Sequence, residues 1–157
     1  GVKIYIPSGA VSGIDALKAA SVGKITSVTL TTRKPPKGLE GAPYLAIKEI
    51  DVNAITKETI IFEGSARDAV KGFPANVNVS AVLSLAGIGA ANTKVRIMTW
   101  PDYKRNIHEV EIIGDSGSIT TRTENVPSEA NPRTSALAIY SAIATLEGIV
   151  KSVRIGT

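Results

Sequence analysis

His108, the only histidine of the chain, is the residue best suited to proton transfer near neutral pH. An imidazole has an ordinary pKa of about 6.5, so it can act as an acid or a base in that range. His108 lies in the segment 106–112, NIHEVEI, where apolar and polar residues alternate as in a strand,. The alternation places it on the same face as Val110 and Ile112,. A partly buried structural histidine fits this pattern better than a catalytic one, and the spacing alone leaves both roles open.

Asn78 is a second polar residue in an unexpected position. It lies in an otherwise apolar segment, 75–86, that predicts a helix buried on most sides, and asparagine is a poor helix former,. The structural alternative is a buried amide that caps the chain break at Pro74,. Glu109 and Glu111 share the strand face opposite the histidine, where we expect them to be solvated or salt-bridged,. With one histidine, no cysteine and dispersed acids, the sequence predicts no metal site,.

Composition predicts one soluble domain in the cytoplasm. The 157 residues are 43% hydrophobic, and no apolar run approaches the roughly 20 residues that cross a bilayer,. There is no cysteine and no signal peptide pattern,. The net charge of +4 comes from scattered cations, and only 4% of residues are aromatic, which argues against nucleic-acid binding,. The chain begins at Gly1 with a strand-like segment, so we expect a fragment of a longer protein.

The elements that must position these residues alternate between strand and helix signals. We expect strands over 2–6, 24–32, 59–63, 93–99, 107–113 and 118–125, helices over 12–21, 66–71, 75–86 and 132–149, and a loop over 35–43,. The last three strands are predicted to form an antiparallel meander. The fold class is α+β, a mostly antiparallel open sheet with helices packed on one face.

The C-terminal helix is predicted to begin with Asn131 as N-cap and Pro132 at the first helical position,. Between residues 135 and 150 only Glu147 is charged, so the helix is apolar on more faces than one small sheet can cover,. A second domain or a second subunit must cover the rest. The glycines of 87–92, GIGAAN, follow a helix rather than a strand, so they do not predict a dinucleotide site,.

Several segments together resemble the L-aspartate dehydrogenase family. In chain order they are 6–13 (IPSGAVSG), 30–36 (LTTRKPP), 73–79 (FPANVNV), 105–109 (RNIHE), and 124–128 (ENVPS) leading into 131–135 (NPRTS). Each is weakly specific alone, but their order and spacing extend almost from end to end. The resemblance implies a two-domain enzyme whose N-terminal Rossmann half binds NAD or NADP. This chain resembles only the second half.

The resemblance also implies what the chain does. Residues 1–157 would form the catalytic, substrate-binding and dimerisation domain of a homodimer, and 132–150 would also pack on the missing Rossmann domain. The reaction would be oxidative deamination of L-aspartate through iminoaspartate to oxaloacetate and ammonia, with iminoaspartate available to NAD biosynthesis. The fragment alone would be inactive. Two alternatives stay open: a related two-domain dehydrogenase or reductase of amino-acid metabolism, and a non-catalytic dimerisation module.

The family's functional residues fall on particular positions of this chain. The active-site histidine falls on His108, and the asparagine that contacts the nicotinamide falls on Asn78. A second cofactor contact falls on Ser12, where the family usually has alanine. The two carboxylates of aspartate require cationic partners, and the cations nearest the shared motifs are Arg33, Lys34 and Arg105,. We expect one or two of the three to bind substrate. The choice between NAD and NADP depends on the absent domain.

Overall fold

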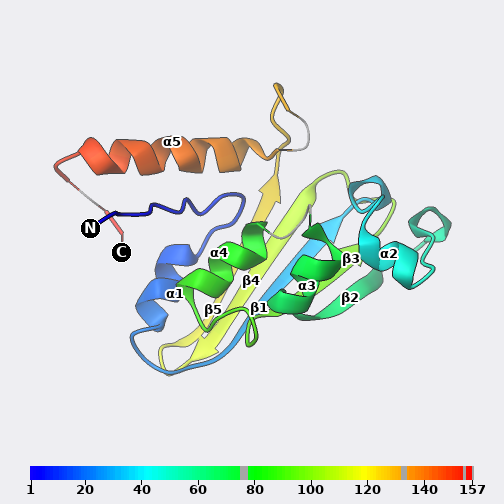
Figure 1. The fold of residues 1–157 in the computed structure, drawn as a ribbon, viewed down its shortest axis with the longest axis horizontal. Helices are drawn as coiled ribbons and strands as arrows, with labels where there is room; N and C mark the ends of the chain where they lie inside the picture. The colour runs from blue at the N-terminus through cyan, green and yellow to red at the C-terminus, as the bar shows by residue number, and fades with distance from the viewer. Residues whose placement is uncertain (75–77, 132–133, 154, 157) are drawn as a thin grey trace.

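A five-stranded sheet with helices on one face forms the body of the molecule in the computed structural model, which describes residues 1–74, 78–131, 134–153 and 155–156 (Figure 1). The strands are β1 Ile25–Lys34, β2 Thr59–Ser65, β3 Lys94–Thr99, β4 Asn106–Gly114 and β5 Gly117–Asn125. The helices are α1 Ile14–Ala20, α2 Pro43–Ile47, α3 Ala66–Gly72, α4 Asn78–Ala86 and α5 Ala136–Val150, with 3-10 turns at Pro36–Gly38 and Val52–Ala54. The predicted α+β class is confirmed.

Strand β1 lies at the centre of the sheet, whose order is β2-β3-β1-β4-β5. It pairs in parallel with β3 and antiparallel with β4, and the other two pairings are antiparallel, so the sheet is mostly antiparallel as predicted. The predicted meander is wrong for β3, because β1 separates β3 from β4. A tight turn at Gly117, with φ of 105°, forces β4 and β5 into a hairpin,. No such short turn joins β3 to β4.

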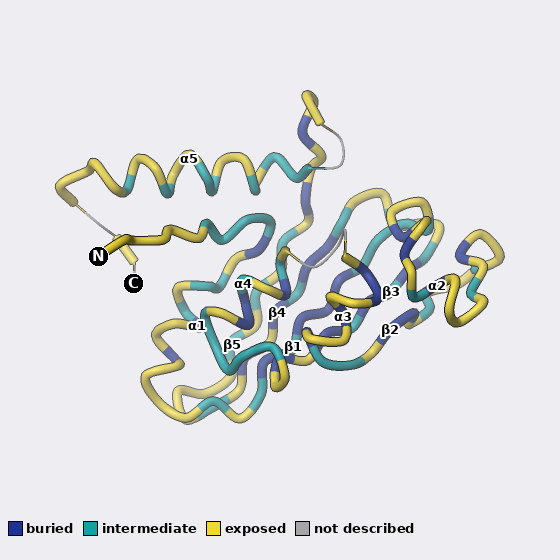
Figure 2. Tube along the Cα trace, viewed as in Figure 1, coloured by how far each residue is buried: buried dark blue, intermediate teal, exposed yellow. Residues whose placement is uncertain are grey.

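The core lies between the sheet and helices α1, α3 and α4 (Figure 2). The inward faces of β1 and β4 contribute Val28, Leu30, Val110 and Ile112, all at most 1% exposed. Their β-branched and leucine side chains alternate with polar residues, which is why both segments form strands,. Burial of each such side chain contributes roughly 1.5–3 kcal/mol. This packing fixes the strand that carries His108.

Helix α4 differs from the prediction of a helix buried on most sides. Its described part begins at Asn78, and residues 75–77 lie outside the described residues. It buries Ser80, Leu83 and Ser84, while Leu85 is 71% exposed. One sheet face accommodates only one side of the helix, and the buried Ser84 hydroxyl is satisfied because it donates to the Ser80 carbonyl at 2.7 Å,.

The N-terminal segment is not the strand predicted over 2–6. It has no neighbouring strand to pair with and runs as irregular chain beside α5 (Figure 1). Val2 and Ile4 are 95% and 84% exposed. The prediction of a loop over 35–43 is also incomplete. This segment contains a 3-10 turn and leads into α2, a helix that the sequence pattern did not predict.

Helix α5 begins later than predicted, at Ala136, with Ser135 rather than Asn131 as N-cap. Two backbone hydrogen bonds, from Ser128 N to Thr134 O at 2.8 Å and from Ala136 N to Val126 O at 2.9 Å, hold the preceding loop closed. Pro132 and Arg133 lie outside the described residues.

The helix stands away from the sheet, and none of its residues is buried (Figure 2). Leu146 is 66% exposed and Tyr140 65%. The prediction of uncovered apolar faces on this helix is therefore confirmed. Among the described residues, no helix is long and apolar enough to cross a membrane.

The face of the sheet opposite the helices carries mainly threonines and charged side chains. Ion pairs join Arg96 to Glu63 at 2.8 Å and Arg122 to Glu124 at 3.2 Å. Its large exposed hydrophobic residues are Ile60 and Ile113. Alternation explains the outcome, because the apolar half of each strand faces the helices.

Candidate active site

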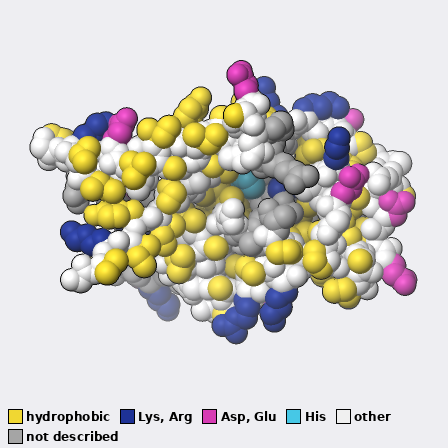
Figure 3. Space-filling model, turned by 45° about the horizontal axis from the view of Figure 1, so that its top comes forward, with side chains coloured by type: hydrophobic (Ala, Val, Ile, Leu, Met, Phe, Trp, Pro, Cys, Tyr) yellow, Lys and Arg dark blue, Asp and Glu magenta, His cyan; other side chains and the backbone are white. Residues whose placement is uncertain are grey.

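A pocket of about 360 Å³ opens at the end of the sheet where β1 ends and β4 begins. Its other walls come from the loop before α1, the start of α4 and the start of α5. Three of the predicted site residues line it: Lys34, Asn78 and His108. Figure 3 looks onto this hollow, with the cyan histidine side chain visible inside it.

Strand register explains how the pocket is assembled. His108 of β4 pairs with Thr32 of β1 on one side and with Thr123 of β5 on the other, so three polar side chains form a row on the inward face. Two residues further along each strand, Lys34 of β1 and the paired Asn106 and Asn125 of β4 and β5 form a second row that also lines the pocket,. The two rows lie about 7 Å apart, the rise of two strand residues.

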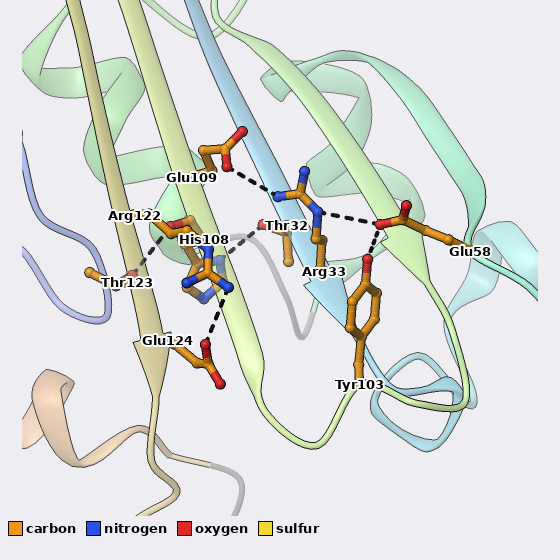
Figure 4. A network of polar contacts seen from close by, with 9 residues as sticks. All are labelled: Thr32, Arg33, Glu58, Tyr103, His108, Glu109, Arg122, Thr123 and Glu124. Carbon is orange, nitrogen blue, oxygen red and sulfur yellow. Dashed lines mark hydrogen bonds and ion pairs between the residues drawn. The ribbon is translucent and has the colours of Figure 1, made fainter.

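His108 is 6% exposed, and its ring is oriented by its neighbour in the sheet. Its Nδ1 lies 3.0 Å from Thr32 Oγ1, which leaves Nε2 as the ring nitrogen available to the pocket (Figure 4). Burial, and secondarily the positive charge of Lys34, lowers the pKa of His108 to about 4,. The imidazole is therefore neutral at pH 7.

Lys34 is half-buried at the last position of β1. Burial lowers the pKa of its ammonium group to about 8, so most of the group stays charged at pH 7,. A cation in this position attracts an anionic ligand into the pocket.

Arg33 does not reach the pocket, because neighbouring residues of a strand point to opposite faces. Its guanidinium lies on the uncovered face of the sheet, 3.5 Å from Glu58 and 3.5 Å from Glu109 (Figure 4). Tyr103 donates a hydrogen bond to the same Glu58. Arg105 is exposed in the loop before β4 and does not line the pocket. Of the three predicted cations, only Lys34 lies with the histidine.

Asn78 is exposed at the first described position of α4, on the pocket wall. Its side-chain amide makes no hydrogen bond with the described residues, so the alternative of a buried capping amide is not what the structure has.

Ser12 lies outside the pocket lining, two residues beyond Ala10, which does line it. Its carbonyl accepts a hydrogen bond from Thr121 Oγ1 at 3.1 Å. Next to it, Gly13 has φ of 86°, and a Cβ there would lie 2.9 Å from a Thr121 methyl. The turn that carries Ser12 is therefore fixed against β5.

The polar residues that hold the pocket loop are not evident from the sequence pattern. Asn125 donates to the Ala10 carbonyl at 3.0 Å and accepts from Ser135 Oγ at 2.7 Å. Gly9 N donates to Ser141 Oγ at 3.0 Å. Thr32 and Asn106 were missed as well. The strand register would have revealed the partners of His108, but a single sequence does not specify which residues of two strands lie opposite each other.

Comparison with known proteins identifies the family of the chain. The family model described as "Aspartate dehydrogenase, C-terminal" matches residues 15–149. The chain belongs to this family. It is 56% identical over 155 residues to the L-aspartate dehydrogenase of Methanosarcina barkeri and 44% identical over 155 residues to that of Nitrosopumilus maritimus. These alignments cover 99% and 98% of this chain.

The fold also matches a solved member of the family. The crystal structure of aspartate dehydrogenase from Thermotoga maritima aligns with a TM-score of 0.78 and 31% sequence identity, over 98% of this chain and 56% of that one. The chain thus spans somewhat more than half the length of its relatives, 57% for both archaeal proteins.

Proposed function

We propose that this chain is the catalytic, substrate-binding domain of an NAD(P)-dependent L-aspartate dehydrogenase. The enzyme would convert L-aspartate through iminoaspartate to oxaloacetate and ammonia. One observation carries the proposal: a neutral, buried imidazole and a charged ammonium line the same pocket in a chain of the aspartate dehydrogenase family.

Lys34 attracts the carboxylates of the substrate. Its ammonium lies in the pocket wall and keeps most of its charge at pH 7. Charge-assisted hydrogen bonds to carboxylates are about twice as strong as neutral ones. We assign substrate binding to Lys34 rather than to Arg33, because Lys34 lines the pocket of His108 whereas Arg33 lies on the other face of the sheet.

His108 accepts protons from groups next to the reacting carbon. When Nδ1–H donates to Thr32 Oγ1, the lone pair of Nε2 faces the pocket and can accept a proton from the substrate amine or from the water that attacks the imine,. Burial is the larger cause that lowers the pKa of His108, and a carboxylate bound at Lys34 would offset the second cause, the positive charge of Lys34,. General acid–base catalysis of this kind contributes roughly 10² to 10⁴ in rate.

The residues at the rim fit a nicotinamide ring. Asn78 offers an exposed amide with no hydrogen bond to the described residues, beside the pocket of His108, and an amide can donate to and accept from a carboxamide,. Bound NAD or NADP would supply the acceptor for the hydride that leaves the substrate. Ser12, in the turn beyond the pocket, would contact the cofactor through its exposed side.

Two surfaces would join this domain to others. The exposed apolar side of α5 and of residues 2–6 would pack on a Rossmann-type nucleotide-binding domain, which supplies a role for Leu146 and Tyr140,. The uncovered face of the sheet would pair two copies into a homodimer, through its threonines, ion pairs and the two isoleucines,.

The test is enzymatic. A longer protein that combines residues 1–157 with an N-terminal nucleotide-binding domain should reduce NAD or NADP in the presence of L-aspartate and release ammonia, whereas the 157-residue chain alone should not. Activity with another amino acid and none with aspartate would favour a related dehydrogenase. No activity with any amino acid would favour the dimerisation module.

A further inference from the structure

Asn106 is, with Asn78, a pocket residue whose side-chain amide makes no hydrogen bond with the described part of the chain. It is the first residue of β4, half-buried, and lines the pocket. A half-buried amide of this kind takes its partners from whatever fills the pocket.

Asn125, the neighbour of Asn106 across the hairpin, differs in how its side-chain amide is used. Asn125 pairs with Asn106 in the sheet and lines the same pocket, yet both ends of its amide are used, at 3.0 Å to Ala10 O and 2.7 Å from Ser135 Oγ. Asn125 therefore fixes the walls of the pocket, and Asn106 does not.

On its other side Asn106 lies next to the end of β1. The pairing of β1 with β4 ends at Arg33 and Ile107, and the next residue of each strand, Lys34 and Asn106, lines the pocket,. A primary amide donor beside an ammonium group is a suitable site for a carboxylate, since both groups donate hydrogen bonds to its oxygens.

The distance of Lys34 and Asn106 from His108 determines which of the two substrate carboxylates they bind. The α-carboxylate is bonded to the reacting carbon and must stay close to the row of the histidine. The row of Lys34 and Asn106 lies about 7 Å further along the strands. We propose that Lys34 and Asn106 bind the side-chain carboxylate of the substrate, so that Asn106 helps to select a four-carbon amino dicarboxylate over a monocarboxylate; this rests on the proposed function.

The inference is tested by binding of L-aspartate and L-alanine, which differ by the side-chain carboxylate alone. The ¹⁵N-labelled imidazole of His108 reports binding by NMR in the 157-residue chain, without turnover. The wild-type chain should prefer aspartate by about tenfold or more, the effect of one charge-assisted contact. Asn106→Leu, similar in size, should remove about tenfold of the affinity for aspartate and change that for alanine less than twofold.

Two further variants separate binding from folding. Asn106→Asp keeps the size of the side chain but adds a negative charge, and should weaken aspartate binding more than Asn106→Leu does. Lys94→Met removes a lysine from the opposite face of β3 and should change neither affinity. Amide NMR spectra that overlay on the wild type show that each variant is folded.

Three results would overturn the inference: equal affinity of the wild type for the two amino acids, equal weakening of both by Asn106→Leu, or no effect of Asn106→Leu and Asn106→Asp. Failure of the proposed function would be seen in a different experiment, the activity assay of the longer protein. If the longer protein oxidises no aspartate while the chain still selects aspartate through Asn106, the dehydrogenase proposal falls and the carboxylate subsite remains.

Discussion

Thr32 Oγ1 lies 3.0 Å from His108 Nδ1 across neighbouring antiparallel strands, and both side chains are buried. A hydroxyl can donate or accept, so this contact fits both tautomers of the ring; the proposed base requires the one in which Nδ1–H donates to Thr32 Oγ1 and Nε2 carries the lone pair,. Rigid strands hold both partners, which keeps the ring fixed without any loop movement. Thr32 is therefore a positioning residue for the proposed base.

Replacement of Thr32 by valine should lower kcat of the longer enzyme about tenfold, because a hydrogen bond worth about 0.5–1.5 kcal/mol no longer orients the imidazole. The KM for cofactor should not change. Thr32→Ser should restore the rate, and Thr31→Val, on the other face of the same strand, is the matched control. The ¹⁵N shifts of His108 would report the tautomer directly. Equal rates for the valine and serine variants would contradict the role.

Replacement of His108 by alanine should lower kcat by roughly 10² to 10⁴, because it removes the proton acceptor. Cofactor affinity should stay close to that of the wild type. Steady-state kinetics with aspartate and NAD or NADP separate the two quantities. A variant with near wild-type turnover would end the catalytic assignment.

Replacement of Asn78 by alanine should raise the KM for cofactor by up to about tenfold, through a lost amide hydrogen bond worth about 0.5–1.5 kcal/mol. Asn78 is exposed, so the melting temperature should hardly change. Cofactor titration of the longer enzyme, followed by fluorescence, provides the measurement. An unchanged KM and rate would leave Asn78 without a functional role.

Stability should depend on pH through His108. Its folded pKa of about 4 lies below the ordinary value of about 6.5, so the unfolded chain binds more protons between these values,. The free energy of unfolding should therefore fall as pH drops from about 6.5 to 4, by at most about 1.4 kcal/mol per pH unit from this group.

Denaturant titrations at about pH 7, 5.5 and 4.5, which span the window between the two pKa values, would measure this dependence. His108→Gln cannot take up the proton, so its unfolding free energy should fall less steeply. Parallel pH profiles for the two proteins would rule out the assigned pKa.

The 157-residue chain alone should form a dimer and expose a sticky apolar surface. Sedimentation at several concentrations measures the first property, and binding of a hydrophobic dye the second. Tyr140→Lys with Leu146→Lys should reduce dye binding and leave the dimer intact, because both residues lie on α5 and not on the sheet. A strictly monomeric chain would contradict the proposed interface.

Local pattern was sufficient to predict much of this fold. The alternation around His108 correctly placed His108, Val110 and Ile112 on one buried face, and the charge-poor sequence of α5 correctly indicated a helix without enough cover. The strand predicted over 2–6 failed because a strand needs a neighbour, which no local pattern reveals.

Non-local pairing limited the prediction of the site. The sequence indicated Lys34 and His108 but could not show that Thr32 contacts the histidine. Nor could it show that the amide of Asn125 is bonded at both ends while that of Asn106 makes no hydrogen bond with the described residues. These facts depend on register and on contacts between residues more than 70 positions apart, such as Thr32 and His108,.

The alternation of β1 makes the pocket unusually sensitive to insertions and deletions. Lys34 and Thr32 face the pocket, and Arg33 between them faces the ion-pair network on the other side. Loss of a single residue from the middle of this strand would shift the register by one, turn Arg33 inward and send Thr32 and Lys34 outward. A change in length in the loops of this domain leaves the pocket rows in place, whereas a change within residues 28–34 of β1 does not.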